Sequence, residues 1–479
     1  MWRSVRPALL ALALTGCAVG PSYERPALDI PSTWRMDRVD AEAVIDAAWW
    51  RAFDDPALEA LVDEAVANNL DLAVALERVR EFAARVGITA SGRWPQLGYD
   101  ASAGRARLSR ETGVGALGGS RTVDNFETNL NIRWELDLWG RIARAEDAAE
   151  ADFLAAQENR RALVLALVTA VAETYVELRS LDAQLEVANR SLASRRQSLD
   201  LFELQLERGV LSELEVAQLR SEFERTAATI PALERTITLT ENALSVLLGR
   251  PPGDIPRGRR LTELAGPPIP AGLPSDLLER RPDLRAAEQQ LVAAEARVGV
   301  ARADRFPRIA LTGLLGLASG DLSRLAESSA EQAAIAAGLD GPLFTAGRVR
   351  GGIEAAEAAA ARAELAYRGA VLTALREAED ALVTHATTRA ERDARVRQVE
   401  ALRDYRRFAV MRYDNGYTSY LAVLDAERSL FDGELQALRT AADALRALIG
   451  LYKALGGGWI DRALAAPSGN TETVTEPPS

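Results

Sequence analysis

The clearest pattern in the chain is a strict alternation of apolar and polar side chains between residues 126 and 138. Phe126, Leu130 and Trp134 stand on one face with the other even positions, whereas Glu127 and Arg133 stand on the opposite face. A period of two predicts a β-strand, here roughly 40 Å long at about 3.3 Å per residue. An apolar face opposite a polar face is typical of a membrane-barrel strand. A half-buried sheet in a soluble domain is the alternative.

Three weaker strands are expected at about 97–109, 308–318 and 331–344. They alternate less regularly, and the last is rich in Ala and poor in aromatic residues. Because natural membrane barrels have at least about eight strands, four strands per chain require several chains. Two copies would supply eight strands and three would supply twelve, and the pattern itself does not choose between them.

Most of the remaining chain follows coiled-coil spacing. A long helix is predicted from Arg141 to Arg208, which at 1.5 Å per residue is roughly 100 Å. A turn at 209–212 reverses the chain into a shorter helix, which Pro231 is expected to kink, and a second reversal is expected at 416–419. The apolar positions recur every seven residues at Val164, Val171, Leu178, Leu185, Leu192, Leu199 and Leu206, at Val216, Phe223, Ile230, Ile237 and Leu244, and at Leu424, Phe431, Leu438, Leu445 and Tyr452.

The two halves of the chain repeat each other. Asp283-Leu284 lies 212 residues after Asp71-Leu72, and Gly347-Arg348 lies 207 residues after Gly140-Arg141. A period above 200 residues indicates a duplicated domain rather than a solenoid. We expect each short returning helix to stack end to end with the helix that precedes the strands, both beside the long helix. Two independent antiparallel coiled coils are the alternative.

These patterns predict a mainly α-helical, internally duplicated chain that contributes four strands to a membrane β-barrel. The expected segments are a signal peptide (1–16), an N-terminal segment (17–70), a first repeat (71–249, with a β-hairpin at about 96–139 and a helical hairpin at 141–249), a linker (250–282), a second repeat (283–456, with a β-hairpin at about 308–344 and a helical hairpin at 348–456) and a C-terminal tail (457–479).

Composition removes several classes of function. The chain has 479 residues and a net charge of −12, which argues against a nucleic-acid partner. One Cys and one His leave no disulfide pair and no Cys/His metal cluster. His385 is interpreted as an ordinary helix residue, and no phosphate-binding loop of the Walker type is found. We therefore expect no enzyme activity, no cofactor and no metal.

The amino terminus has the pattern of an exported precursor. Arg3 and Arg6 precede an apolar run at 8–14, which is too short to span a bilayer. Leu14-Thr15-Gly16-Cys17 resembles the bacterial lipobox, so we expect Cys17 to be the first mature residue and to carry covalent lipid, including palmitate. An ordinary signal peptide that contains a Cys is the alternative. No later stretch predicts a transmembrane helix.

The segment Gly-Leu-Pro-Ser-Asp-Leu-Leu-Glu-Arg-Arg-Pro-Asp-Leu at 272–284 resembles the linker of TolC-like, NodT-type outer-membrane efflux lipoproteins. Further matches are Trp49-Trp50, Phe53-Asp54-Asp55-Pro56, the run from Trp134 to Arg141, Leu247-Leu248-Gly249 and Gly456-Gly457-Gly458-Trp459.

This resemblance implies a homotrimer with a twelve-stranded barrel in the outer membrane and a helical tunnel in the periplasm. It also implies an equatorial domain, built from the lipid-anchored N-terminal segment (17–70), the linker (250–282) and the C-terminal tail (457–479). It implies the exit duct of a tripartite efflux system, which conducts small molecules passively when coupled to a periplasmic adaptor and an inner-membrane pump, most simply a proton-driven one of the RND type. A non-conducting coiled-coil or adaptor lipoprotein is the alternative, and the alternating strand at 126–138 argues against it. The sequence does not indicate the substrate.

The turns between the long and returning helices are the candidate adaptor contacts. The residues concerned are Arg208, Gly209, Leu211 and Ser212 in the first turn and Gly416, Thr418 and Ser419 in the second. Glycine allows a positive φ at low cost, so shaping the turn is the alternative role for both glycines.

The start of the second returning helix is the candidate periplasmic gate. Leu421 and Asp425 are four residues apart and share one helix face. In the resembling family this helix start carries the constriction, so three copies would bring together a ring of leucines and a ring of carboxylates. Tyr413 is expected to brace the closed state through a hydrogen bond, and Ala422 leaves no second acidic ring. In the alternative, Asp425 only complements the positive end of its helix.

Overall fold

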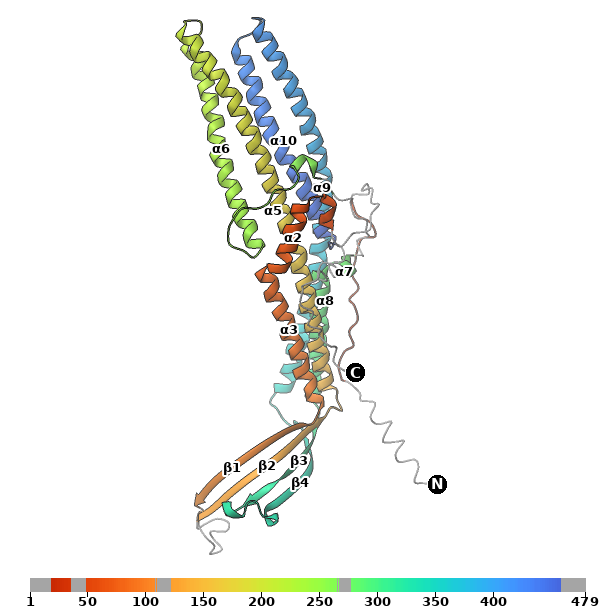
Figure 1. Ribbon diagram of the computed structural model, residues 1–479. Coiled ribbons are helices and arrows are strands. Elements are labelled where there is room, and N and C mark those ends of the chain that lie inside the picture. The colour runs from red at the N-terminus through yellow and green to blue at the C-terminus, as the bar shows by residue number, and fades with distance from the viewer. Residues whose placement is uncertain are drawn as a thin grey trace. The chain divides into compact units, whose positions relative to one another are not determined.

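The computed structural model describes residues 19–35, 49–107, 109, 122–264, 266 and 277–457. Helix, β-hairpin and helical hairpin follow one another twice along the chain (Figure 1). The main helices are α2 (Pro56–Asn68), α3 (Leu70–Ala90), α5 (Arg141–Glu207), α6 (Glu213–Leu247), α7 (Leu277–Arg280), α8 (Pro282–Ala303), α9 (Arg348–Asp414) and α10 (Tyr420–Ala454), and the strands are β1 (Gln96–Arg107), β2 (Thr122–Leu136), β3 (Arg308–Ser319) and β4 (Glu331–Asp340).

The chain divides into two compact units, and each takes segments from both sequence repeats. The first unit contains the described residues up to Ala27 together with 78–157 and 286–368. The second contains the described residues of 28–77, 158–285 and 369 onward. The sheet therefore belongs to the first unit, and both helical turns belong to the second.

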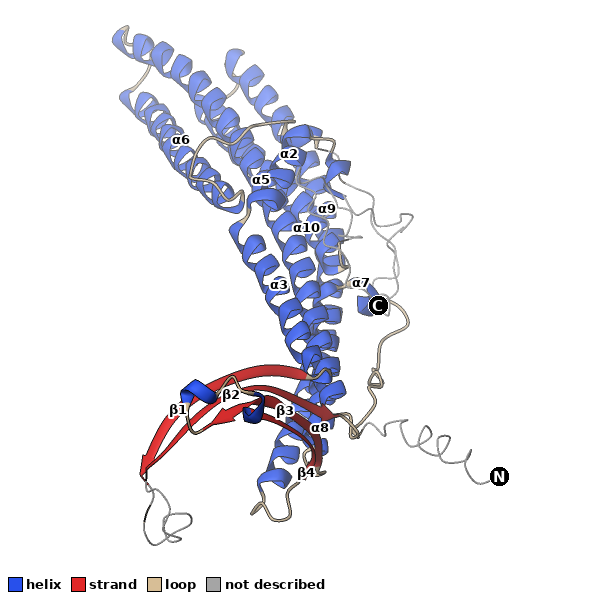
Figure 2. Cartoon of the chain, turned by 60° about the horizontal axis from the view of Figure 1, so that its bottom comes forward, coloured by secondary structure: helices blue, strands red, loops and turns tan. Residues whose placement is uncertain are grey.

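The four strands of the first unit form one antiparallel sheet in the order β1-β2-β3-β4, which is curved (Figure 2). Its register places Tyr99 opposite Leu130 and Leu130 opposite Leu315. Residues that face one another across neighbouring strands point to the same side of a sheet. One face is therefore apolar, and it consists of Leu97, Tyr99, Ala101 and Ala103 from β1, Phe126, Thr128, Leu130, Ile132 and Trp134 from β2, Ile309, Leu311, Gly313, Leu315 and Leu317 from β3, and Ala333, Ile335, Ala337 and Leu339 from β4.

The opposite face explains why the second hairpin alternates so poorly in sequence. On β1 and β2 this face carries Asp100, Asn129 and Asn131, with the Asn129 amide donating to Asp100 at 3.2 Å. On β3 and β4 it carries mainly Ala, Gly and Thr, although Gln332 donates to Asn129 at 2.9 Å. On β3 and β4, small side chains replace the polar ones. Successive residues still point to opposite faces, but the sequence no longer alternates clearly between apolar and polar residues.

The helices of the second unit bury most of the positions that the heptad pattern singles out and half-bury the rest. Val171, Leu178 and Leu244 are fully buried. α6 includes Pro231 within one helix of 35 residues, and a kink at that proline stays a prediction. No helix in the described part of the chain has a stretch long and apolar enough to span a bilayer.

Two polar clusters inside the second unit account for sequence motifs noted above. Buried Asp55 accepts hydrogen bonds from the Tyr175 hydroxyl at 2.8 Å and from the Arg259 amide at 2.9 Å. Buried Arg281 donates to Glu377 at 2.7 Å and to the carbonyl of Ala454 at 3.2 Å. Asp55, from the run Phe53-Asp54-Asp55-Pro56, and Arg281, from the segment 272–284, therefore connect parts of the chain that are far apart in the sequence.

Candidate functional site

The two helical turns of the second unit have the same backbone construction. Gly209 and Gly416 have φ values of 70° and 74°. The Gly209 amide donates to the Leu206 carbonyl at 2.8 Å, and the Val210 amide donates to the Gln205 carbonyl at 2.9 Å. The same two bonds recur from Gly416 to Tyr413 and from Tyr417 to Arg412, both at 2.9 Å. This Schellman arrangement needs a left-handed residue, which glycine adopts without strain. The two glycines therefore shape the turns, whether or not the turns also bind a partner.

The turns differ in how the returning helix begins. The Ser212 amide donates to the Glu215 carboxylate at 3.0 Å, so α6 starts with a side-chain cap. Ala422 occupies the corresponding position of α10, and its amide bonds to the Ser419 carbonyl at 3.2 Å. Both turns are largely exposed, with Tyr417 exposed by 76%, so their surfaces are accessible in the single chain.

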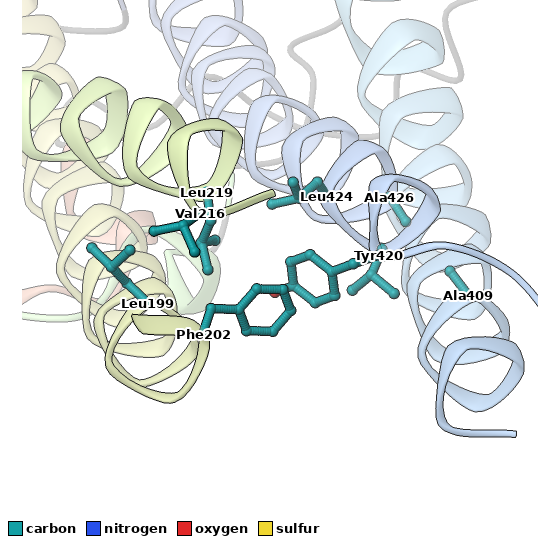
Figure 3. Close-up of a cluster of buried hydrophobic side chains, with 9 residues drawn as sticks. Leu199, Phe202, Val216, Leu219, Ala409, Tyr420, Leu424 and Ala426 are labelled. Carbon is teal, nitrogen blue, oxygen red and sulfur yellow. The ribbon is translucent and has the colours of Figure 1, made fainter. Parts of the chain in front are cut away.

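An apolar cluster joins the two hairpins next to these turns. Phe202 of α5 packs on Tyr420 of α10 with ring centroids 4.2 Å apart, as Figure 3 shows. Tyr413 meets Tyr420 edge to face at 5.1 Å. The cluster consists of Leu199, Phe202, Val216, Leu219, Ala409, Tyr420, Val423, Leu424 and Ala426. Burial, followed by the charges of Glu215 and Asp414, raises the pKa of Tyr413 above its usual value, so its phenol stays neutral.

The two candidate gate residues line one cavity of about 790 Å³ between α6 and α10. Leu421 is 57% exposed, and the side chain of Asp425 is 45% exposed. The Tyr405 hydroxyl of α9 donates to Asp425 at 3.1 Å, and this hydrogen bond raises the pKa of Tyr405. The Arg428 guanidinium lies 2.6 Å from the same carboxylate. Asp425 is therefore held from both sides by residues that the sequence analysis did not select.

A simple signal could have found both partners. Arg428 stands three residues after Asp425, which is the spacing of an ion pair on one helix face. Tyr405 lies on the other arm of the hairpin, on the opposite side of the turn at Gly416. Antiparallel helices bring residues at similar distances from their turn together. The bracing hydrogen bond expected at Tyr413 stays a prediction, and the tyrosine that binds Asp425 is Tyr405.

The first repeat lacks this chemistry at the matching positions. Leu214 and Gln218 precede Leu421 and Asp425 by 207 residues, and Ser198 and Ser221 precede Tyr405 and Arg428 by the same interval. Leu214 is 66% exposed. The acidic group thus occurs once per chain, although its backbone setting occurs twice.

His385 lies on α9, apart from both turns. It is half-buried, and its Nδ1 atom has no hydrogen-bond partner. Burial, followed by the positive charges of Arg389 and Arg392, lowers its pKa. A neutral imidazole in this setting fits the role of a helix residue. The part of the chain that the structure describes holds no group of three or more residues able to bind a metal ion, and Cys17 lies outside that part.

Comparison with known proteins gives one consistent result. The family model for outer membrane efflux proteins matches residues 61–250 and 273–457. The chain is 37% identical over 461 residues to the toluene efflux pump outer membrane protein TtgI of Pseudomonas putida, covering 95% of this chain and 98% of that protein. It is 35% identical over 459 residues to the cation efflux system protein CusC of Escherichia coli O6:H1, covering 95% and 98%.

A solved structure agrees. The open state of the MtrE outer membrane channel of Neisseria gonorrhoeae superposes with a TM-score of 0.83 at 30% identity, covering 92% of this chain and 98% of that chain.

These matches confirm the predicted fold class, family and exit-duct function. The family and the relatives are efflux channels, not enzymes. The chain belongs to the outer membrane efflux protein family and is the outer-membrane channel component of an efflux system.

Proposed function

We propose that three copies of this chain form one conducting channel, that Leu421 and Asp425 close its periplasmic end, and that the helical turns receive a periplasmic adaptor. The sheet supports the assembly. Within the described residues β1 and β4 each pair on one side only, and the apolar face leaves Tyr99 88% and Ile335 93% exposed. Such edges and such a face need covering. Three copies would join β4 of one chain to β1 of the next and close twelve strands.

The gate proposal rests on the exposed Leu421 and Asp425 beside one cavity. Three leucines brought together would exclude water from a narrow passage, and three carboxylates would attract cations. Because each Asp425 is paired with Arg428, the ring is closer to electrical balance than three bare carboxylates would be. Removing Asp425 would leave three unpaired guanidinium groups and repel cations instead.

The partners follow from the duct being passive. A channel that supplies no energy needs an inner-membrane pump, and we propose one of the RND type, coupled through an adaptor that contacts Arg208, Gly209, Leu211 and Ser212 in one turn and Gly416, Thr418 and Ser419 in the other. The names of the relatives mention solvents, toluene, cations and pyoverdine. Because these cargoes share no chemistry, we propose transport of small molecules without assigning one class.

We also propose that Cys17 is lipidated. The Val19 amide, two residues later, donates to the Trp139 carbonyl at 3.1 Å, where β2 leads into α5. Tyr23 and Arg25 then bind the Glu288 carboxylate, each at 2.7 Å. A chain held this close to the sheet supports an anchor at the membrane end of the first unit.

Single-channel conductance in planar bilayers tests the gate. We expect Leu421→Ala to raise the conductance of the closed channel, because it removes the apolar constriction. Leu214→Ala, the matching position of the first repeat, should leave it unchanged. We expect Asp425→Ala to weaken block by divalent cations. Gln218→Ala should not, because Gln218 lines the same cavity but carries no charge.

Each part of the proposal has its own contrary outcome. Equal conductance in Leu421→Ala and wild type would place the gate elsewhere. A detergent-extracted particle with a mass other than three chains would refute the trimer. A trimer without conductance in any variant would favour the non-conducting spacer.

A further inference from the structure

A second cavity of the second unit is lined by an unusual concentration of arginine. It has a volume of about 470 Å³ and lies between α5, α9 and α10. Its lining residues are Val187, Arg190, Ser191, Ser194, Arg195, Arg403, Arg406, Glu427, Leu430, Phe431 and Glu434. Four guanidinium groups thus face two carboxylates, in a chain whose net charge is −12.

The four arginines differ in how their positive charges are balanced by carboxylates. Arg195 is a fixed part of the wall, because its side chain is only 2% exposed and is paired with Glu222 at 2.9 Å. Arg406 is paired with Glu427 at 3.1 Å. Glu222 also pairs with Arg225 at 3.0 Å, and Arg225 in turn lies 3.3 Å from Asp432. The charges of Arg195 and Arg406 are therefore balanced by nearby carboxylates.

Arg190 and Arg403 share a single carboxylate. Glu434 lies 2.8 Å from Arg403 and 3.5 Å from Arg190. The two guanidinium groups come from different helices, and their side chains are 61% and 62% exposed. One positive charge at the mouth of the cavity is therefore left without a counter-charge among the lining residues.

We propose that this cavity binds a small anion that carries a phosphate or several carboxylates. Guanidinium groups recognise both through paired, charge-assisted hydrogen bonds. An anion between Arg190 and Arg403 would balance the excess charge and bridge α5 to α9. The cavity is within the size range of small-molecule sites, and its buried floor of Phe431 would accept the carbon skeleton of an organic anion.

The cavity opens on the opposite side of α10 from the candidate gate. Asp425 and Glu434 are nine residues apart, which at about 100° per residue places them roughly half a turn from each other. If the gate residues face the passage, as proposed above, the arginine cavity faces outward to the periplasm. The anion would then come from the periplasm rather than from the transported stream.

The duplication supplies a matched control. Arg397 of α9 stands 207 residues after Arg190 of α5 and is its counterpart in the second repeat. Arg196 of α5 stands 207 residues before Arg403 of α9 and is its counterpart in the first repeat. Neither lines this cavity. The double substitution Arg196→Gln with Arg397→Gln therefore removes the same charge from the same helices without touching the site.

The test uses the purified full-length assembly in detergent, titrated calorimetrically with inorganic phosphate and with citrate at constant ionic strength. We expect saturable binding in wild type and in the control double variant. In Arg190→Gln with Arg403→Gln we expect binding weaker by at least about tenfold, because each lost charge-assisted contact is worth about that factor.

Absence of saturable binding in wild type, or equal weakening in both double variants, would overturn the anion site. Single-channel conductance of the same proteins keeps this result separate from the channel proposal. The cavity variants should conduct as wild type does, so a failure of the anion site leaves the duct intact, and a failure of conductance in all proteins concerns the duct alone.

Discussion

The carboxylate of Asp55 connects three segments of the second unit, and its removal gives a sharp test of how that unit is held together. Oδ1 accepts from the Ala57 amide at 2.9 Å and so caps α2. Oδ2 accepts from the Tyr175 hydroxyl of α5 at 2.8 Å and from the Arg259 amide, in the linker after α6, at 2.9 Å. Asp55 is only 4% exposed, so water cannot easily replace these bonds.

The expected cost of Asp55→Ala follows from these contacts. Loss of an N-cap costs about 1 kcal/mol, and each buried donor left without an acceptor costs about 1 to 3 kcal/mol. Two donors and one cap give about 3 to 7 kcal/mol for local opening of α2. Since every 1.4 kcal/mol is tenfold, amide exchange in α2 should accelerate by at least about a hundredfold.

Hydrogen exchange of the purified protein, followed by mass spectrometry, measures this opening directly. Tyr175→Phe should accelerate amide exchange in the linker less than Asp55→Ala does, because it removes the hydroxyl but leaves the Asp55 cap of α2 in place. Asp54→Asn is the matched control: Asp54 is adjacent, its side chain is 73% exposed, and its φ of 53° is one that Asn tolerates. Its ion pair with Arg259 is exposed and worth at most about 1 kcal/mol, so losing that charge should change the exchange little. Unchanged exchange in Asp55→Ala, or equal acceleration in Asp54→Asn, would refute the reasoning.

Three further predictions concern other parts of the chain. Because burial lowers the pKa of His385 in the folded state, the unfolded state binds the proton more readily. Folding stability should therefore fall as the pH drops below about 6.5, and the melting temperature of His385→Gln should show a smaller drop between pH 7.5 and 5.5. Arg281→Ala should lower the melting temperature more than a change at its exposed neighbour Arg280, because it leaves the carbonyl of Ala454 without its buried donor, which costs about 1 to 3 kcal/mol; an equal effect of both changes would contradict this. Cys17→Ser should abolish lipid labelling and leave an unprocessed precursor, and an unmodified amino terminus in the wild-type protein would disprove the lipoprotein proposal.

The sequence was sufficient wherever period alone determines structure. The spacing of seven identified Val171, Leu178 and Leu244, all fully buried, and the alternation at 126–138 identified β2. It was weaker on β3 and β4, because small residues on one face removed the polar half of the signal. The contact of Tyr175 with Asp55 depends on which segments meet in space, and periodicity carries no information about that.

The duplication also limits what the channel end can look like. The two turns share their glycine, their positive φ and their hydrogen bonds, so the backbone of the two repeats has stayed alike where the chain must reverse. The side chains have not: Asp425, Arg428 and Tyr405 correspond to Gln218, Ser221 and Ser198. In a trimer, six similar helical hairpins would therefore present only three acidic groups. A constriction built on Asp425 would therefore have threefold rather than sixfold symmetry. Its opening would require movement of the α9–α10 hairpin, and not an equal movement of both hairpins.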